Sequence, residues 1–417
     1  MLKKIISTVL VMTMALSIAA CGKTTTPAAT SSSAPSASAT PAPAGKAFKM
    51  GAYLQLTGGN SAVGLEADNS IKLAVKNINA QGGFNGQQID YIPYDTQGSA
   101  EEAVKVVTKM IETDKVDSVI GSINSSEVLA AAGYLNDAKI FNFGLGTSST
   151  WMKKDWPYVF RASFNNDFGA PTYAKMIKED LGLKKVAVFY GQDDSSLSNG
   201  KTCVRVFTEA GLEVVAEETY DSGDVDYTAQ VRNIINSGAE AIYFVVIAND
   251  APLFVKQMRQ NGYNGLLFDK DTFFVSQREI AGVEASNYIA SVVPYVTYNA
   301  LEDSDIEIMS NFLKQYKEEY KVLPKTECAY RAWDTMMVFW EATKIAGSND
   351  SEALKKATAT IKGFEGLGGT FDYTTGDREG LHILNAFIQI EGKNTRWDTW
   401  LKDGGYEAYK AATGSKY

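Results

Sequence analysis

The sequence predicts an α/β protein with two similar lobes, each built on a mostly parallel sheet with helices on both faces. From Phe48 onward, short apolar segments alternate with amphipathic segments of about 10–15 residues, which is the spacing of strand–helix–strand units. The alternation starts again after Asn166, so the chain carries two such blocks in series. Its length of 417 residues is sufficient for two domains.

The first block alternates clearly. Its first helix carries apolar residues at i, i+3, i+4 and i+7, namely Ile71, Ala74, Val75 and Ile78. A later helix begins at Ser99, with Glu102 three residues on, which is the pattern of a capping box. The expected strands are 48–56, 87–95, 116–121 and 138–146, and the expected later helices are 99–114 and 125–137.

The second block repeats the pattern. The expected strands are 184–190, 212–220, 239–247, 265–269 and 287–295, and the expected helices are 200–211, 227–238 and 250–262. In open α/β sheets, ligands bind beyond the carboxyl ends of the strands. A cleft between the two lobes is therefore the expected binding place.

The N-terminal residues 1–20 have the parts of a secretory signal peptide, with Lys3 and Lys4 before an apolar stretch too short for a comfortable membrane span. Small residues then precede Cys21, as in a bacterial lipobox, so we expect Cys21 to be lipidated. Residues 21–46 are rich in Ser, Thr, Ala and Pro and are expected to form a disordered linker behind this anchor. The alternative is an ordinary signal peptide with an incidental Cys21.

Composition excludes several functions. The formal net charge is −9, and no long basic run provides a surface for nucleic acid. The chain has one histidine, His382, and three cysteines, so no His/Cys cluster can hold zinc or iron, and we expect neither a metal nor a cofactor. His382 lies in a strand-like segment and is expected to enter a core. These features count against an enzyme, although paired carboxylates remain possible.

The candidate binding corner is the stretch "SVIGSINSSEVLAAAGYL", Ser118 to Leu135. An apolar strand stops at Gly121, and small polar residues precede a helix. Ser125 has two interpretations: it caps the helix, or it and the free N–H groups of the helix start hold a carboxylate. The residues alone leave both open.

The sequence resembles the extracytoplasmic solute-binding proteins of ABC transporters, of the leucine/isoleucine/valine-binding type, with the type I periplasmic-binding-protein fold. The segments that carry this resemblance include "AVKNINAQGGFNGQQI", "VDSVIGSINSSEVLAAA", "YVFRASFNND" and "KKVAVFYGQDD". It implies two lobes joined by three hinge strands, with lobe one at 48–166 plus 296–381 and lobe two at 167–295 plus 382–417. It also implies closure on a small solute and delivery to an ABC permease.

The resemblance assigns site residues one by one. Ser125, with its neighbour Ser126 and nearby amides, corresponds to the group that binds an α-carboxylate. Thr147 corresponds to a second hydroxyl, and Leu145 to the backbone position before it. Asp271 corresponds to the acceptor of an α-ammonium group, with Asp269 an equal candidate by spacing.

The expected pocket walls differ from those of a leucine binder. The family's tryptophan corresponds to Val63 and one tyrosine to Ile247, while Ser195 or Ser196 is the nearest match to the other tyrosine. Tyr53 lies near the end of the first strand, where it either lines the pocket or packs in the core. Trp151 or Trp156 either supplies an aromatic wall or packs within the lobe.

The disulfide of the leucine binder is absent, because its positions correspond to Gly98 and Asn124. Cys203 and Cys328 would lie in different lobes and are expected to be free thiols.

The sequence thus predicts a monomeric lipoprotein on the outer face of the cell membrane, held there by its lipid alone, which binds an amino acid or related carboxylate for an ABC permease. Two alternatives stay open: a ligand-sensing module of the same fold, and a binder of aromatic acids or amides.

Overall fold

The computed structural model describes residues 46–415, apart from residues 60, 193, 222, 247–249, 271–272, 274, 293–306 and 383–385. The signal segment and Cys21 therefore lie outside the described residues. Within the described part of the chain, none of the helices is both long and apolar enough to span a membrane.

The first sheet is wholly parallel, with the strand order β2-β1-β3-β4-β5. Its strands are β1 (Phe48–Leu54), β2 (Ile89–Asp95), β3 (Ser118–Gly121), β4 (Asn142–Gly144) and β5 (Val159–Arg161). The fifth strand adds to the four expected from the sequence, because the segment around Arg161 pairs with β4 before the chain leaves the sheet.

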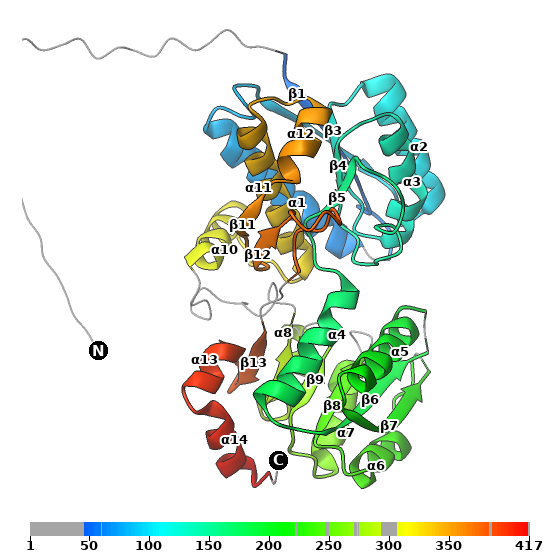
Figure 1. Cartoon of the computed structure of the whole chain (residues 1–417), viewed down its shortest axis with the longest axis vertical. Helices are drawn as coiled ribbons and strands as arrows, with labels where there is room; N and C mark the ends of the chain where they lie inside the picture. The colour runs from blue at the N-terminus through cyan, green and yellow to red at the C-terminus, as the bar shows by residue number, and fades with distance from the viewer. Residues whose placement is uncertain are drawn as a thin grey trace, which may run out of the picture. The chain divides into compact units, whose positions relative to one another are not determined.

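Helices cover both faces of this sheet (Figure 1). One face carries α1 (Ser61–Ala80), α10 (Glu307–Tyr320), α11 (Glu327–Ala346) and α12 (Ser351–Thr358), and the other carries α2 (Ala100–Lys109) and α3 (Ser125–Asp137). Successive residues of β1 point to opposite faces of the sheet. Met50 and Ala52 pack with α1 on one face, whereas Tyr53 packs with α2 and α3 on the other.

The single helix expected at 99–114 consists of two consecutive elements in the structure. Ser99 caps α2 by accepting the N–H of Glu102, as the capping-box pattern predicts. A π-helical turn, Met110–Asp114, follows and ends at Lys115 in the left-handed conformation.

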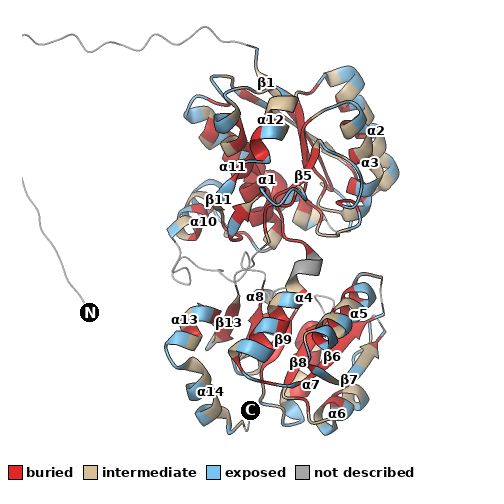
Figure 2. Cartoon of the chain, in the orientation of Figure 1, coloured by how far each residue is buried: buried red, intermediate tan, exposed pale blue. Residues whose placement is uncertain are grey.

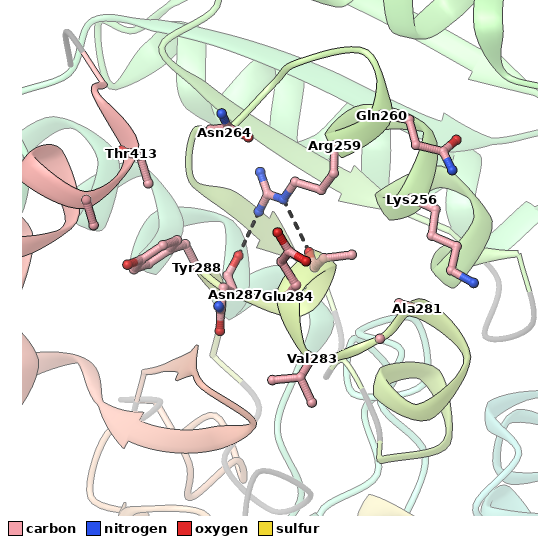
Figure 3. A pocket seen from close by; sticks show the side chains of 13 residues that line it. Lys256, Arg259, Gln260, Asn264, Ala281, Val283, Glu284, Asn287, Tyr288 and Thr413 are labelled. Carbon is pink, nitrogen blue, oxygen red and sulfur yellow. Dashed lines mark hydrogen bonds between the residues drawn. The ribbon is translucent and has the colours of Figure 1, made fainter.

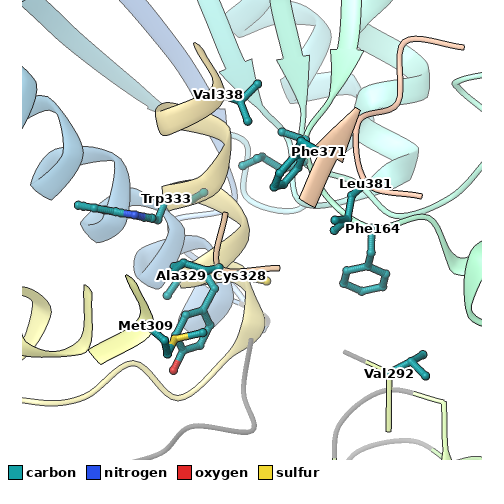
Figure 4. Close-up of a cluster of buried hydrophobic side chains, with 14 of the residues drawn as sticks. Phe164, Val292, Met309, Cys328, Ala329, Trp333, Val338, Phe371 and Leu381 are labelled. Atoms are coloured by element: carbon teal, nitrogen blue, oxygen red, sulfur yellow. The ribbon is translucent and has the colours of Figure 1, made fainter. Parts of the chain in front are cut away.

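Residues after 306 complete the first lobe with α10, α11 and α12 and with a two-stranded hairpin of β11 (Lys362–Glu365) and β12 (Thr370–Asp372). Helix α11 is mostly buried. Figure 4 shows Trp333 and Val338 from α11 in the same apolar cluster as Met309 of α10 and Phe371 of β12.

The second sheet has the order β14-β13-β10-β9-β8-β6-β7. Its strands are β6 (Lys185–Gly191), β7 (Glu213–Tyr220), β8 (Ala241–Val245), β9 (Leu267–Asp269), β10 (Ile289–Ser291), β13 (Phe387–Ile390) and β14 (Lys393–Arg396). The pairs from β7 to β10 are parallel, and only β13 and β14 add antiparallel pairs at one edge.

Helices also cover both faces of the second sheet. They are α4 (Asn166–Lys175) with the π-turn Met176–Asp180, α5 (Asp194–Glu209), α6 (Thr228–Asn236), α7 (Ala251–Gln260), α8 (Val275–Ala281), α9 (Val283–Ser286), α13 (Trp397–Lys402) and α14 (Gly405–Thr413). Along β6, Val186 and Val188 belong to one apolar cluster, and Ala187 and Phe189 belong to another. Figure 2 shows the central strands β6, β8 and β9 of this sheet as buried.

In the order of the described elements, the chain passes between the sheets three times: after β5, after β10 and after β12. The predicted fold class, two α/β lobes each built on a mostly parallel sheet, is confirmed, whereas the three hinge strands stay a prediction. His382 precedes β13 and lies half-buried, with its Nε2 3.2 Å from Thr375 Oγ1, so it is not within a strand of the described chain.

Candidate functional site

The corner at the end of β3 depends on a glycine. Gly121 has a φ of +139°, and a Cβ there would lie 2.2 Å from the Tyr53 backbone oxygen. Only glycine fits this close approach. The chain then turns through Ser122 to Asn124, and α3 begins at Ser125.

A buried polar network lies beneath the corner. Glu127, fully buried, accepts hydrogen bonds from Ser122 Oγ at 2.7 Å and from Asn124 Nδ2 at 2.7 Å. Asn124 Nδ2 also donates to Gln55 Oε1 at 2.9 Å. The network ties the end of β1 to the start of α3.

The start of α3 keeps free donors. Asn124 is the N-cap residue, yet its side chain makes no cap hydrogen bond. The backbone N–H groups of Ser125 and Ser126 have no acceptor among the described residues. Ser125 is half-buried and Ser126 is exposed. Because Ser125 is the first helical residue and not the N-cap, its hydroxyl does not cap the helix.

The loop after β4 lies against this helix start. Leu145 N–H donates to the Ser122 carbonyl at 3.2 Å, and Ser148 N–H donates to Ser125 Oγ at 3.1 Å. A Cβ on Gly146 would lie 2.7 Å from Ser125 Oγ, so the glycine allows the loop to approach the serine. Thr147, half-buried, makes no side-chain hydrogen bond to the described residues. Its hydroxyl, like the helix amides, is available to a ligand.

Two buried arginines hold the carbonyl groups of this loop. Arg331, on α11, donates to Leu145 O at 2.8 Å, and Arg161, at the end of β5, donates to Ser148 O at 2.8 Å. Each is paired with a carboxylate: Arg331 with Glu327 at 2.9 Å, and Arg161 with the buried Glu379. Buried charges require such partners, so the loop is fixed by satisfied ion pairs.

Trp151 and Trp156 lie in an apolar cluster between α3 and β5. Trp151 is fully buried with the Arg161 guanidinium 4.9 Å from its ring centre, and Trp156 is half-buried. Their positions are those of packing residues.

Among the other predicted residues of lobe one, Leu145 is buried, and Val63 is half-buried on α1 against the main core. Tyr53 is fully buried, which favours the core interpretation over the pocket. Burial, reinforced by the nearby Glu127 carboxylate, raises the pKa of Tyr53 well above its usual value.

The predicted residues of the second lobe are mostly outside the described chain. Asp271 and Ile247 fall in undescribed positions, and the side chain of Ser195 is not described. Asp269 is the last residue of β9 and is buried, as is Ser196. The predicted ammonium site therefore stays a prediction.

Both described cysteines, Cys203 on α5 and Cys328 on α11, are buried free thiols, as predicted. Burial raises the pKa of the Cys328 thiol to about 12.

Sequence reasoning missed Glu127, Arg161 and Arg331 as parts of the corner. Glu127 stands three residues after Asn124, which resembles a capping box, and that signal was available. The arginines come from distant segments that only the fold brings to the loop.

The described chain also has cavities away from this corner. One of about 670 Å³ surrounds Arg259 in the second lobe (Figure 3), where that arginine donates to the carbonyl groups of Ala285 and Asn287. Another of about 640 Å³ lies between α10 and α11 and is lined by Trp333 and Trp340. Neither contains a predicted site residue.

Two α/β lobes, with hydroxyls and free amides gathered at the carboxyl ends of parallel strands, define the class of two-lobed binding proteins for small solutes. Residues 47–392 match a family model described as periplasmic binding protein. The chain therefore belongs to this family, and its predicted place in the leucine/isoleucine/valine-binding group of ABC-transporter binding proteins is confirmed.

The relatives agree with that placement. "Leu/Ile/Val-binding protein homolog 7" of Brucella abortus (strain 2308) is 24% identical, over 77% of this chain and 82% of the relative. A solved branched-chain amino acid transporter substrate binding protein from Streptococcus pneumoniae, in complex with isoleucine, has a TM-score of 0.67 at 25% identity, covering 84% of this chain and 98% of that one.

A solved solute binding protein of an ABC transporter from R. palustris, in complex with benzoate, has a TM-score of 0.65 at 23% identity. It covers 84% of this chain and 95% of that one. This likeness concerns the fold.

Proposed function

We propose that this protein is the extracytoplasmic binding component of an ABC transporter and that it holds a small carboxylate, most simply an amino acid, at the start of α3. The observation that carries the proposal is that the N–H groups of Ser125 and Ser126 have no acceptor in the described part of the chain. A helix N-terminus with free amides attracts an anion through hydrogen bonds and through the helix dipole.

The hydroxyls of Ser125 and Thr147 complete the corner. Ser125 Oγ accepts the Ser148 N–H, so its own proton is free to be donated to a carboxylate oxygen. Thr147 lies one residue before Ser148 and supplies a second hydroxyl from the loop that the two arginines hold. Hydrogen bonds to a charged acceptor are stronger than those between neutral groups.

The proposal extends to the second lobe. Residues 48–166 plus 296–381 form lobe one, residues 167–295 plus 382–417 form lobe two, and closure brings the second lobe over the ligand. Asp271, or Asp269, then accepts the ammonium group, and Val63 and Ile247 line the side-chain pocket. Closure follows from a higher affinity of the ligand for the closed form.

The cellular setting is part of the same proposal. The signal-like N-terminus and the lipobox-like position of Cys21 support a lipoprotein on the outer face of the cell membrane. In this proposal it acts there as a monomer and serves a permease. A sensory role would use the same binding event with a different partner.

A second ligand class is an aromatic acid. The benzoate complex of the R. palustris protein, on the same fold, motivates it, because benzoate offers the corner the same carboxylate without an ammonium group. Here Asp271 would have no partner in the ligand.

Calorimetric titration with isoleucine, benzoate, benzamide and glucose tests these assignments. Binding of isoleucine supports the amino-acid proposal, and binding of benzoate without isoleucine supports the aromatic acid. Benzamide tests whether the carboxylate charge is needed. Binding of glucose alone would contradict the carboxylate corner.

A further inference from the structure

The N-cap residue of α3 does not cap its own helix. Asn124 has the extended backbone of an N-cap residue, with φ −79° and ψ 117°. An asparagine in this position ordinarily accepts, through Oδ1, the N–H of the second or third helical residue. Here the second is Ser126, and its N–H has no acceptor in the described chain.

The hydrogen bonds of Asn124 explain the missing cap. Its Nδ2 donates one bond to Gln55 Oε1 at 2.9 Å and one to Glu127 Oε1 at 2.7 Å. An amide nitrogen has two protons, so both are used. Because both partners are oxygen acceptors, they fix which end of the amide faces them: Nδ2 faces the network, and Oδ1 is turned away from it.

Both acceptors are themselves fixed. Glu127 is fully buried and also accepts from Ser122 Oγ at 2.7 Å. Gln55 is 7% exposed, and a Cβ on Gly98 would lie 2.6 Å from its Nε2, so glycine at that position makes room for the amide. A buried carboxylate and a confined amide leave Asn124 little freedom to rotate.

We propose that Gln55 and Glu127 are positioning residues that hold Asn124 out of its capping conformation and so keep the N–H of Ser126 open for the ligand's anionic group. This inference rests on the proposed function for its purpose, but the restraint on Asn124 can be tested without ligand. Capping by Asn124 would compete with the ligand for the same donor.

A second observation also indicates a ligand at this place. The indole Nε1 of Trp151 is buried and has no acceptor among the described residues. A Cβ on Gly146 would lie 3.2 Å from that nitrogen and 2.7 Å from Ser125 Oγ, so Gly146 lies beside both groups. The corner thus holds more donors than the described protein satisfies.

The first measurement is amide hydrogen exchange of Ser126 by NMR in the ligand-free full chain. Gln55→Met keeps the length of the side chain and removes its acceptor. An N-cap hydrogen bond typically changes the equilibrium between the capped and the open helix end by about fivefold. Exchange of the Ser126 amide should therefore slow by about that factor in Gln55→Met. Gln81→Met, at an exposed glutamine near the end of α1, is the matched control and should leave it unchanged.

The double variant Gln55→Met/Asn124→Ala distinguishes capping of α3 by Asn124 from a loss of loop stability. Alanine cannot cap, so exchange at Ser126 should return to the level of Asn124→Ala alone. If Gln55 served only to stabilise the loop, Gln55→Met would speed the exchange at Ser126 or leave it unchanged. Either of those results overturns the inference.

Affinity gives the second readout, with isoleucine and benzoate as the titrants. Gln55→Met should weaken the binding of whichever titrant the wild type binds by about fivefold, and the loss should vanish in the Asn124→Ala background. Slower exchange with unchanged affinity would support the restraint on Asn124 and contradict a carboxylate at α3. The failure of the inference and that of the proposed function are therefore distinguishable.

Discussion

The backbone N–H of Ser148 donates to Ser125 Oγ at 3.1 Å, and this bond joins the loop after β4 to the first residue of α3. The serine hydroxyl therefore has a structural partner and still retains a proton for a ligand. If Ser125 contacts the ligand as proposed, the same side chain both positions the loop and binds, so substitutions here should affect affinity more than stability.

Ser125→Ala should weaken ligand binding by about 1–3 kcal/mol, because the carboxylate loses a hydroxyl donor and the Ser148 N–H loses its acceptor. Calorimetric titration of the wild type and the variant with the same ligand measures the difference. Ser237→Ala, in the second lobe, removes a hydroxyl that donates to Ile234 O at 2.6 Å and serves as the control. Equal affinity of Ser125→Ala and the wild type would contradict the assignment.

Arg331→Lys should destabilise the protein by about 1–3 kcal/mol, because lysine keeps the charge but cannot reproduce the fork that bonds both Leu145 O and Glu327. Chemical unfolding measures this loss. Arg205→Lys is the matched control: its pair with Glu209 is exposed, so the change should be below about 0.5 kcal/mol. Similar losses for both variants would show that Arg331 does not hold the loop.

The features that the sequence predicted correctly depend on residues close together in the chain. The sequence predicted the apolar face of α1 around Ile71 and Val75 and the Ser99 cap of α2. Each of these features depends on neighbouring residues within one helix. The end of β3 at Gly121 and the start of α3 at Ser125 were predicted as well, because both boundaries are marked by local residue types.

Contacts between distant segments could not be predicted from the sequence. Arg331 lies 186 residues from Leu145, and Glu379 lies 218 residues from Arg161, and no local pattern reports such a pairing. The β11–β12 hairpin and the antiparallel edge of the second sheet were missed likewise, since short strands with few alternating residues give a weak periodic signal.

Gly121→Ala should destabilise the protein by at least about 2 kcal/mol more than Gly238→Ala. Both glycines have positive φ, +139° and +74°, but only the first also brings a Cβ to 2.2 Å from a backbone oxygen, that of Tyr53. Nothing among the described atoms lies within 4 Å of a Cβ at Gly238. Thermal unfolding of the two variants compares them directly, and equal losses would mean that the close approach to Tyr53 is not needed.

Cys21→Ser should release the protein from the membrane fraction, because one thioether-linked lipid anchor is the proposed attachment. Fractionation of cells that express the wild type or the variant, followed by immunoblotting, measures the shift. Cys203→Ser, at a buried thiol of α5, is the control and should remain with the membrane if it folds. A variant at position 21 that stays membrane-bound would contradict lipidation there.

The two buried thiols should be unreactive in the native protein, and the titration of Cys328 should lower the stability of the protein at alkaline pH. Burial raises the pKa of Cys328 to about 12, against 9.0 for an unperturbed thiol. Below pH 9 both states keep the proton, so this group adds no pH dependence. Between about pH 9 and 12 the unfolded thiol loses its proton while the folded one retains it, so the free energy of unfolding falls as the pH rises.

Thiol labelling and alkaline unfolding check this expectation in a Cys21→Ser background, which leaves only the two buried thiols. Labelling at pH 8 should be negligible in the native protein and complete in denaturant, since the thiolate is the reactive form. Cys328→Ala should flatten the fall in stability above pH 9, whereas Cys203→Ala provides the comparison for removing a buried thiol. Rapid labelling of native Cys328 would show that α11 opens far more readily than its burial implies.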